Sequence, residues 1–138
     1  TFRWQTGNIN INSTSNNYVS YCWAEIAGFS KFGSYVGNGS ADGPFIYLGF
    51  RPKYVMVKPT SAAGSWQIED TARSPYNVMD QRLFAEDSSA EIVNGNGLID
   101  YLSNGFKPRV NHPGNNGSGA TYIYMAFAEN PFKNALAR

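Results

Sequence analysis

Few side chains in this sequence have the chemistry for catalysis or metal binding. The 138-residue chain has one cysteine, Cys22, and one histidine, His112. Cys22 alternates with aromatic residues in a run typical of a strand, so we expect a buried, inert thiol. His112 lies in a loop rich in glycine and asparagine, where a solvated histidine is far commoner than a general base or a metal ligand. The sequence therefore predicts no thiolate metal cluster and no cofactor.

Carboxylates are the remaining catalytic candidates, because a glycosidase needs only two of them, about 5–9 Å apart. Acidic residues gather in the middle of the chain: Glu69, Asp70, Asp80, Glu86, Asp87, Glu91 and Asp100. No Gly-x-Ser-x-Gly, phosphate-loop, His-Glu-x-x-His or calcium-loop motif accompanies them. We predict that the chain is not an enzyme. A polysaccharide depolymerase that uses Glu69 and Asp70 is the last alternative.

Aromatic residues offer a binding chemistry instead, since they make up 15% of the chain. Aromatic rings on a sheet can stack on the apolar faces of sugars. Trp66, beside a hairpin turn, and Tyr76, in an irregular loop, are the candidates for contact with a glycan or receptor. Trp23 and Phe127 are expected in the core. A carbohydrate-binding module is the first alternative function.

These side chains would be positioned by strands. Residues 120–129 form the longest run of β-formers, and both of its faces are apolar, which predicts a central strand covered on both sides. Shorter runs predict strands over residues 18–24, 31–37, 45–48, 53–58, 65–70, 82–86, 98–102 and 105–110, with 53–70 forming a hairpin. Residues 71–81 read as a surface loop, 87–91 as a helical turn, 94–97 and 104–105 as hairpin turns, and 111–119 as a flexible loop. The fold class is all-β: an antiparallel β-sandwich, jelly-roll-like or concanavalin-like, of about eight or nine short strands.

An internal repeat frames the chain. Residues 18–25, YVSYCWAE, align without gaps to residues 122–129, YIYMAFAE. The pair indicates a seam at which one repeat ends and the next begins, and strand addition there would join subunits by backbone hydrogen bonds. The candidate seam residues are Tyr18, Tyr21, Tyr122 and Tyr124. We expect residues 1–17 to be a linker or edge strand and 18–138 to be a single sandwich domain.

Composition limits the partners. The formal net charge is +1 and only 15% of residues are charged, so no basic stripe for nucleic acid exists. No apolar run is long enough to cross a membrane as a helix, so no membrane insertion is predicted. A chain so poor in charge suits burial against identical copies, and we expect a homo-oligomer. Because Thr1 is not an initiator methionine, we expect a fragment or processed product.

Several motifs, in order, resemble a domain of unknown function found in structural and tail-fibre proteins of tailed bacteriophages, marine phages among them. They lie in residues 21–35, 37–45, 49–52, 65–68, 73–77, 102–107 and 122–132. The resemblance implies a virion structural domain of tail-fibre, capsid-fibre or decoration type, without catalytic residues. It implies other virion proteins as partners, a host-surface glycan as a further contact, and a place in the virion after synthesis in the host cytoplasm.

Overall fold

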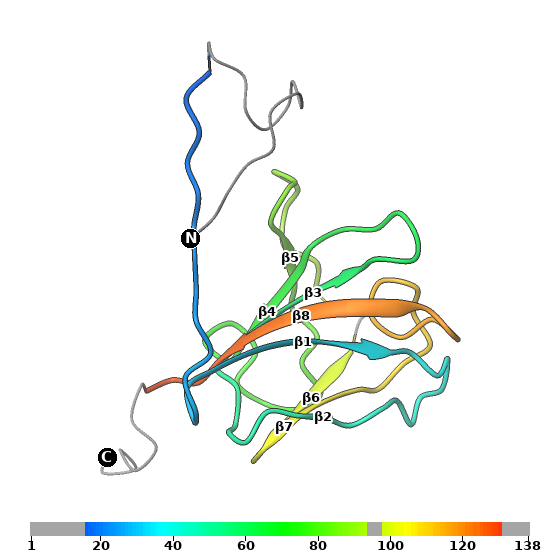
Figure 1. Cartoon of the computed structure of the whole chain (residues 1–138). Helices are drawn as coiled ribbons and strands as arrows, with labels where there is room; N and C mark the ends of the chain where they lie inside the picture. Colours follow the sequence, from blue (N-terminus) through cyan, green and yellow to red (C-terminus); the bar gives the residue numbers. More distant parts are fainter. Residues whose placement is uncertain (1–15, 94–97, 131–138) are drawn as a thin grey trace.

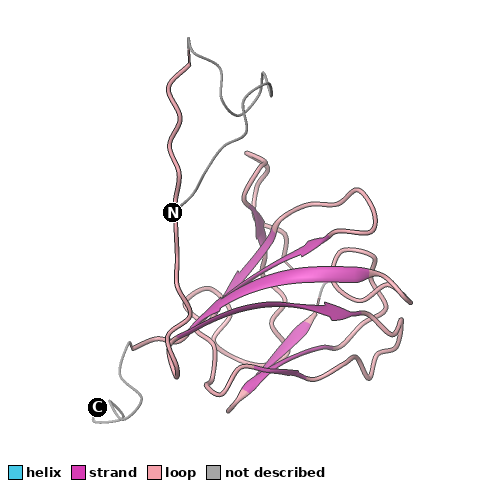
Figure 2. Cartoon of the chain, in the orientation of Figure 1, coloured by secondary structure: helices cyan, strands magenta, loops and turns pink. Residues whose placement is uncertain are grey.

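The computed structural model describes residues 16–93 and 98–130, and these form two antiparallel β-sheets packed as a sandwich (Figures 1 and 2). Five strands make the larger sheet, in the order β1-β8-β3-β4-β5: Ser30–Val36, Thr121–Phe127, Tyr54–Pro59, Gln67–Asp70 and Leu83–Phe84. Three strands make the smaller sheet, in the order β2-β7-β6: Ile46–Tyr47, Gly105–Pro108 and Ile99–Leu102. The described residues contain these eight strands and no helix. The predicted all-β sandwich is confirmed.

Strand β8 is central, as predicted, because it pairs with β1 on one side and β3 on the other. Its alternate residues Tyr122, Tyr124 and Ala126 point into the sandwich and are buried. The opposite face is not covered as expected, since Ile123 is 38% exposed. The strand is therefore buried on one face only within the described chain.

The core lies between the two sheets. Val55 and Val57 of β3 face Ile99 and Tyr101 of the smaller sheet, and all four are at most 1% exposed. Burying each such side chain contributes roughly 1.5–3 kcal/mol, which makes this layer the main source of stability. Met79 adds to the core from the loop between β4 and β5, so the irregular segment 71–81 is anchored by one apolar side chain.

The two predicted hairpins are present, with one shift. Strands β3 and β4 form the first, and β6 and β7 form the second. Leu102 pairs with Gly105, so the second turn is Ser103–Asn104 and not Asn104–Gly105. Gly105 belongs to the ladder, where it pairs with Tyr47 of β2. A Cβ at this position would collide with the carbonyl oxygen of Ile46 in β2. Glycine is kept at this position by close strand approach and not by the turn.

Three local predictions are wrong. Residues 18–24 form no strand, and residues 16–27 are exposed. Residues 87–91 form no helical turn. Residues 111–119 are a loop, but it packs into the protein, because Asn115 and Asn116 are fully buried. The predictions for residues 1–15 and for the turn at 94–97 lie outside the described residues.

Asn116 shows what holds that loop. Its Oδ1 accepts a hydrogen bond from the backbone N–H of Asn38 at 2.9 Å, and its Nδ2 donates to the carbonyl oxygens of Ser40 and Val110 at 2.7 and 3.0 Å. The Tyr122 hydroxyl donates to one carbonyl of the loop and accepts from the N–H of Gly117. Buried polar groups with their partners in place fix a loop as firmly as apolar packing does.

Candidate functional site

The carboxylate pair considered for catalysis is split by the sheet. Glu69 pairs with Val55 on the inner face of β4 and is 1% exposed. Asp70 follows it on the outer face, where its Oδ2 accepts a hydrogen bond from Nε of Arg73 at 2.6 Å. Neighbours on a strand point to opposite sides, so the two carboxylates cannot act on one substrate. The structure does not bring Glu69 and Asp70 together.

Glu69 is nevertheless unusual. Neither carboxylate oxygen has a hydrogen-bond partner in the described part of the chain. Burial raises the pKa of this carboxyl to about 8, although the nearby positive charges of Arg82 and Arg73 act in the opposite direction. Arg82 is also buried, and its Nη1 donates to Oε1 of Gln67 at 3.4 Å. Gln67, Glu69 and Arg82 are thus a group of buried polar side chains in the core. Burying charged groups in this way costs folding stability.

The burial of the histidine and of the cysteine is the reverse of the prediction. His112 is half-buried, its Nδ1 accepts a hydrogen bond from the N–H of Gly114, and burial together with the charge of Arg82 lowers its pKa. Cys22 is exposed, contrary to the prediction of a buried thiol. Trp23, expected in the core, is 56% exposed. Both errors have one cause, since no strand within residues 16–93 or 98–130 pairs with residues 18–24. Among the described residues, no group of three or more His, Cys, Asp or Glu side chains could hold a metal ion.

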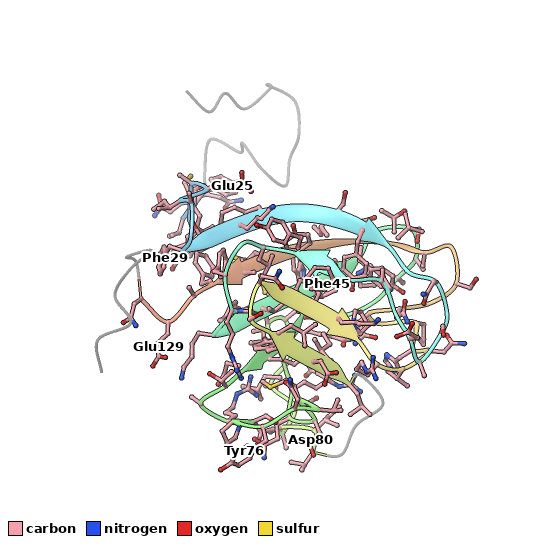
Figure 3. The ribbon with its side chains drawn as sticks, turned by 90° about the horizontal axis from the view of Figure 1, so that it is seen from below. Glu25, Phe29, Phe45, Tyr76, Asp80 and Glu129 are labelled. Atoms are coloured by element: carbon pink, nitrogen blue, oxygen red, sulfur yellow. The ribbon has the colours of Figure 1, made fainter. Side chains whose placement is uncertain are left out.

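The two candidate glycan contacts differ in accessibility. Trp66 is half-buried, and the ammonium group of Lys58 lies 5.5 Å from its ring centre. That ring is a cation–π partner and not an open platform. Tyr76 is 82% exposed, and Figure 3 shows it on the loop that also carries Asp80, on the side of the molecule away from Glu25. Of the two, Tyr76 is the ring that a ligand could reach.

The larger sheet carries an apolar row on its outer face, the side away from the smaller sheet. Residues directly opposite one another share a face, and the register aligns one residue from each strand: Phe32, Met125, Met56, Ile68 and Leu83. None of the five is buried, and Leu83 is 36% exposed. The row crosses the whole sheet with no charge in it. We call it the outer row.

Aromatic rings extend the outer row at the end of the sheet where β1 begins. Phe127 lies against Phe32, Phe29 and Tyr54, with ring centres 5.8, 6.0 and 6.1 Å apart. Ile123 and Val36, 38% and 57% exposed, lie toward the other end of the same face. A sheet face of this composition is typical of a surface that another protein covers.

The four predicted seam residues fall into two groups. Tyr122 and Tyr124 are buried on the inner face of β8, where the ring of Tyr122 stacks on Tyr35 at 5.1 Å. Tyr18 and Tyr21 are exposed, 47% and 75%, on a segment that rises away from both sheets (Figure 1). Within the described chain, residues 18–25 do not pair as a strand with residues 122–129.

Comparison with protein families gives one result that covers nearly the whole chain. A family model described as a domain of unknown function, DUF7483, matches residues 1–131. The chain belongs to this family. Comparison with curated proteins and with solved structures gives no significant match. In the described ranges of this DUF7483 domain, no helix is long and apolar enough to cross a membrane.

The outer row of the DUF7483 domain was not predicted from the sequence. Each strand alone shows only an apolar residue at an outward position, which is ordinary for a half-buried strand. The row exists because β8, from the end of the chain, lies between β1 and β3. The one available signal was the two-faced apolar pattern of residues 120–129, which was interpreted as coverage from both sides.

Proposed function

We propose that this domain is a structural domain of a bacteriophage virion, of tail-fibre, capsid-fibre or decoration type, which assembles with copies of itself. The observation that carries the proposal is the outer row, because an apolar residue from each of five strands stays only partly covered in a single chain. An apolar sheet face that is open to solvent promotes aggregation of a monomer, whereas in an oligomer it can be buried between subunits.

Charge supports the same function. With a formal net charge of +1, copies of the chain repel one another little, so contact between apolar faces meets no long-range electrostatic barrier. The split of Glu69 from Asp70 argues against a depolymerase that uses this pair of carboxylates. The virion setting itself rests on the resemblance of the motifs to phage structural proteins.

Purified particles test the virion setting. Mass spectrometry of particles from a host that carries the gene should find the chain in a fixed ratio to the major structural protein. Negative-stain images of the purified chain should show fibres, rings or another regular form. Particles that lack the chain would contradict the virion role, whether or not the purified chain assembles.

A second candidate function, binding of a host-surface glycan, is favoured by the exposure of Tyr76. A glycan array with the native protein and with Tyr76→Ala is the test. Binding that disappears in Tyr76→Ala but persists in Trp66→Phe would support a Tyr76 site, because Tyr76 is 82% exposed and Trp66 is half-buried. An array without hits would remove this function.

A further inference from the structure

We propose that residues 18–25, which we call the arm, add as an antiparallel strand to the free edge of β1 in a second copy of the chain. The inference rests on the proposed self-association and names the contact that produces it. The partner is the same protein, and the recognition is backbone pairing along β1 together with extension of the outer row.

The arm has the residues of a strand, and no strand among the described residues pairs with it. Val19, Tyr21 and Trp23 are 79%, 75% and 56% exposed. Tyr21 and Trp23 lie on the same side of the extended chain, with ring centres 6.2 Å apart. Aromatic and β-branched residues in an extended segment are costly in water and favourable beside another strand. The arm is therefore an extended segment whose exposed side chains suit pairing with another strand.

The edge of β1 has the complementary property. It is one of the two edge strands of the five-stranded sheet, and no described strand pairs with its other side. At seven residues it is far longer than the opposite edge strand, β5, which has two. It contains no proline, and its one lysine, Lys31, lies over the ring of Tyr47 at 5.2 Å. Natural proteins rarely leave so long an edge without protection.

One outward backbone group of this edge is already engaged from outside the sheet. The N–H of Phe32 donates to Oε1 of Glu25 at 3.2 Å, and Figure 3 shows Glu25 beside the start of β1. Residues 29 and 37 bond to β8, so the backbone groups of Phe32, Ser34 and Val36 point the other way. A carboxylate here takes the place of a missing neighbouring strand.

The chain's own arm leaves this edge before Glu25, whereas Glu25 and the adjoining Ile26 contact Phe32 and Ser30 at the start of the edge. A tight turn joins Ile26 to Ser30 by two backbone hydrogen bonds, with Gly28 at a φ of 78°. The Ser30 hydroxyl then binds the carbonyl oxygen of Ala24 at 2.8 Å, and the segment before it leaves the sandwich (Figure 1). A carbonyl held by Ser30 cannot start a ladder with Phe32. Ile26 thus engages Ser30, and Glu25 engages the N–H of Phe32. The arm of another copy would therefore pair through residues 18–21 with the edge from the Phe32 carbonyl to Val36.

Likeness to β8 sets the register. The arm aligns with residues 122–129, and β8 is the strand that β1 already accepts, with Met125 opposite Phe32 and Ile123 opposite Ser34. The same register places Tyr21 of the arm opposite Phe32 and Val19 opposite Ser34. Both arm residues then lie on the outer face and lengthen the outer row. Reciprocal exchange would close a dimer, and one-way transfer would give a ring or fibre.

Engineered disulfides test the partner and the register together. The triple variant Val19→Cys, Cys22→Ser, Ser34→Cys places its only two thiols opposite each other in the proposed register, within disulfide range for paired strands. The matched control is the single variant Ser34→Cys, which keeps Cys22. It would cross-link within one chain if the arm folded back by continuing the Ile26–Ser30 turn. Both are oxidised mildly and compared on non-reducing gels.

We expect covalent multimers from the triple variant, several-fold more than from the control. A disulfide within a single chain in either variant would overturn the proposal, because it would place the arm on its own β1. The solution mass of the unmodified protein distinguishes failure of the arm contact from failure of self-association. An oligomer whose triple variant does not cross-link refutes the arm contact and leaves the assembly function standing, whereas a strict monomer refutes both.

Proline provides a second, independent readout. Tyr21→Pro removes a backbone donor from the arm without touching the sandwich, because Tyr21 is 75% exposed. Asn16→Pro is the control on the same exposed segment, outside the arm. Tyr21→Pro should lower the solution mass and speed hydrogen exchange at the amides of Ser34 and Val36, and Asn16→Pro should do neither. Equal exchange in both variants would overturn the proposal.

Discussion

Replacing Glu69 with glutamine should remove most of the pH dependence of folding stability in this domain. Glu69 is 1% exposed, its carboxylate oxygens lack hydrogen-bond partners among the described residues, and burial raises its pKa to about 8 from the ordinary value of 4.5. Between those two pH values the folded state holds a proton that the unfolded state releases. The contribution of Glu69 to stability is therefore fully present below pH 4.5 and is lost as the pH rises from 4.5 to 8.

The size of the effect follows from the shift. Each pKa unit corresponds to 1.36 kcal/mol, so the ionisation of Glu69 should cost about 5 kcal/mol between pH 4.5 and pH 8. That is a large part of the 5–15 kcal/mol by which domains are usually stable. Glutamine has the same shape and no charge. The free energy of unfolding of the Glu69→Gln protein should therefore rise, relative to that of the native protein, by about this amount between pH 4.5 and pH 9.

Urea unfolding followed by tryptophan fluorescence measures the difference, at one protein concentration because association adds to stability. His112 contributes a slope of the opposite sign below its ordinary pKa, and this slope cancels when the two proteins are compared. Glu129→Gln is the control, since that carboxylate is 46% exposed. Parallel stability curves for the native and Glu69→Gln proteins would refute the reasoning.

Three further substitutions test the packing that holds the sheets together. Asn116→Ala removes three hydrogen bonds of a fully buried side chain and should cost about 2–4 kcal/mol in urea unfolding, whereas Asn111→Ala, at an exposed position, should change little. Met79→Ala opens a cavity in the core and should cost about 2–5 kcal/mol by the same measurement; a loss below 1 kcal/mol would show that the loop does not anchor there. Gly105→Ala should lower the melting temperature by several degrees, because its Cβ would collide with the Ile46 carbonyl oxygen. An unchanged melting temperature would mean that β2 moves freely against β7.

Local patterns in the sequence predicted the parts of the fold that local patterns determine. The alternation in residues 53–58 and 65–70 gave the β3–β4 hairpin, because adjacent strands joined by a short turn need no distant information. The central position of β8 followed from a long run with two apolar faces. The two-residue period grouped Tyr122, Tyr124 and Ala126 on one face, which is the inner face, but Phe127, expected in the core, lies on the outer face.

Predictions that depend on a distant partner failed. Residues 18–24 have the pattern of a strand, but a strand forms only beside another, and none lies beside them in the described chain. The predicted burial of Cys22 and Trp23 failed for that reason. The loop 111–119 has the composition of a mobile segment, yet Asn116 is fixed by Asn38 and Ser40 from the other end of the sequence. The outer row likewise depends on a register between strands far apart in the chain.

The mass of the intact protein in solution tests self-association most directly. Light scattering coupled to size exclusion, repeated over a series of concentrations, gives that mass without labels or substitutions. The outer row and the arm predict a mass that is a multiple of the 15.2 kDa chain and persists at micromolar concentration. A mass of 15.2 kDa at every concentration would contradict the account.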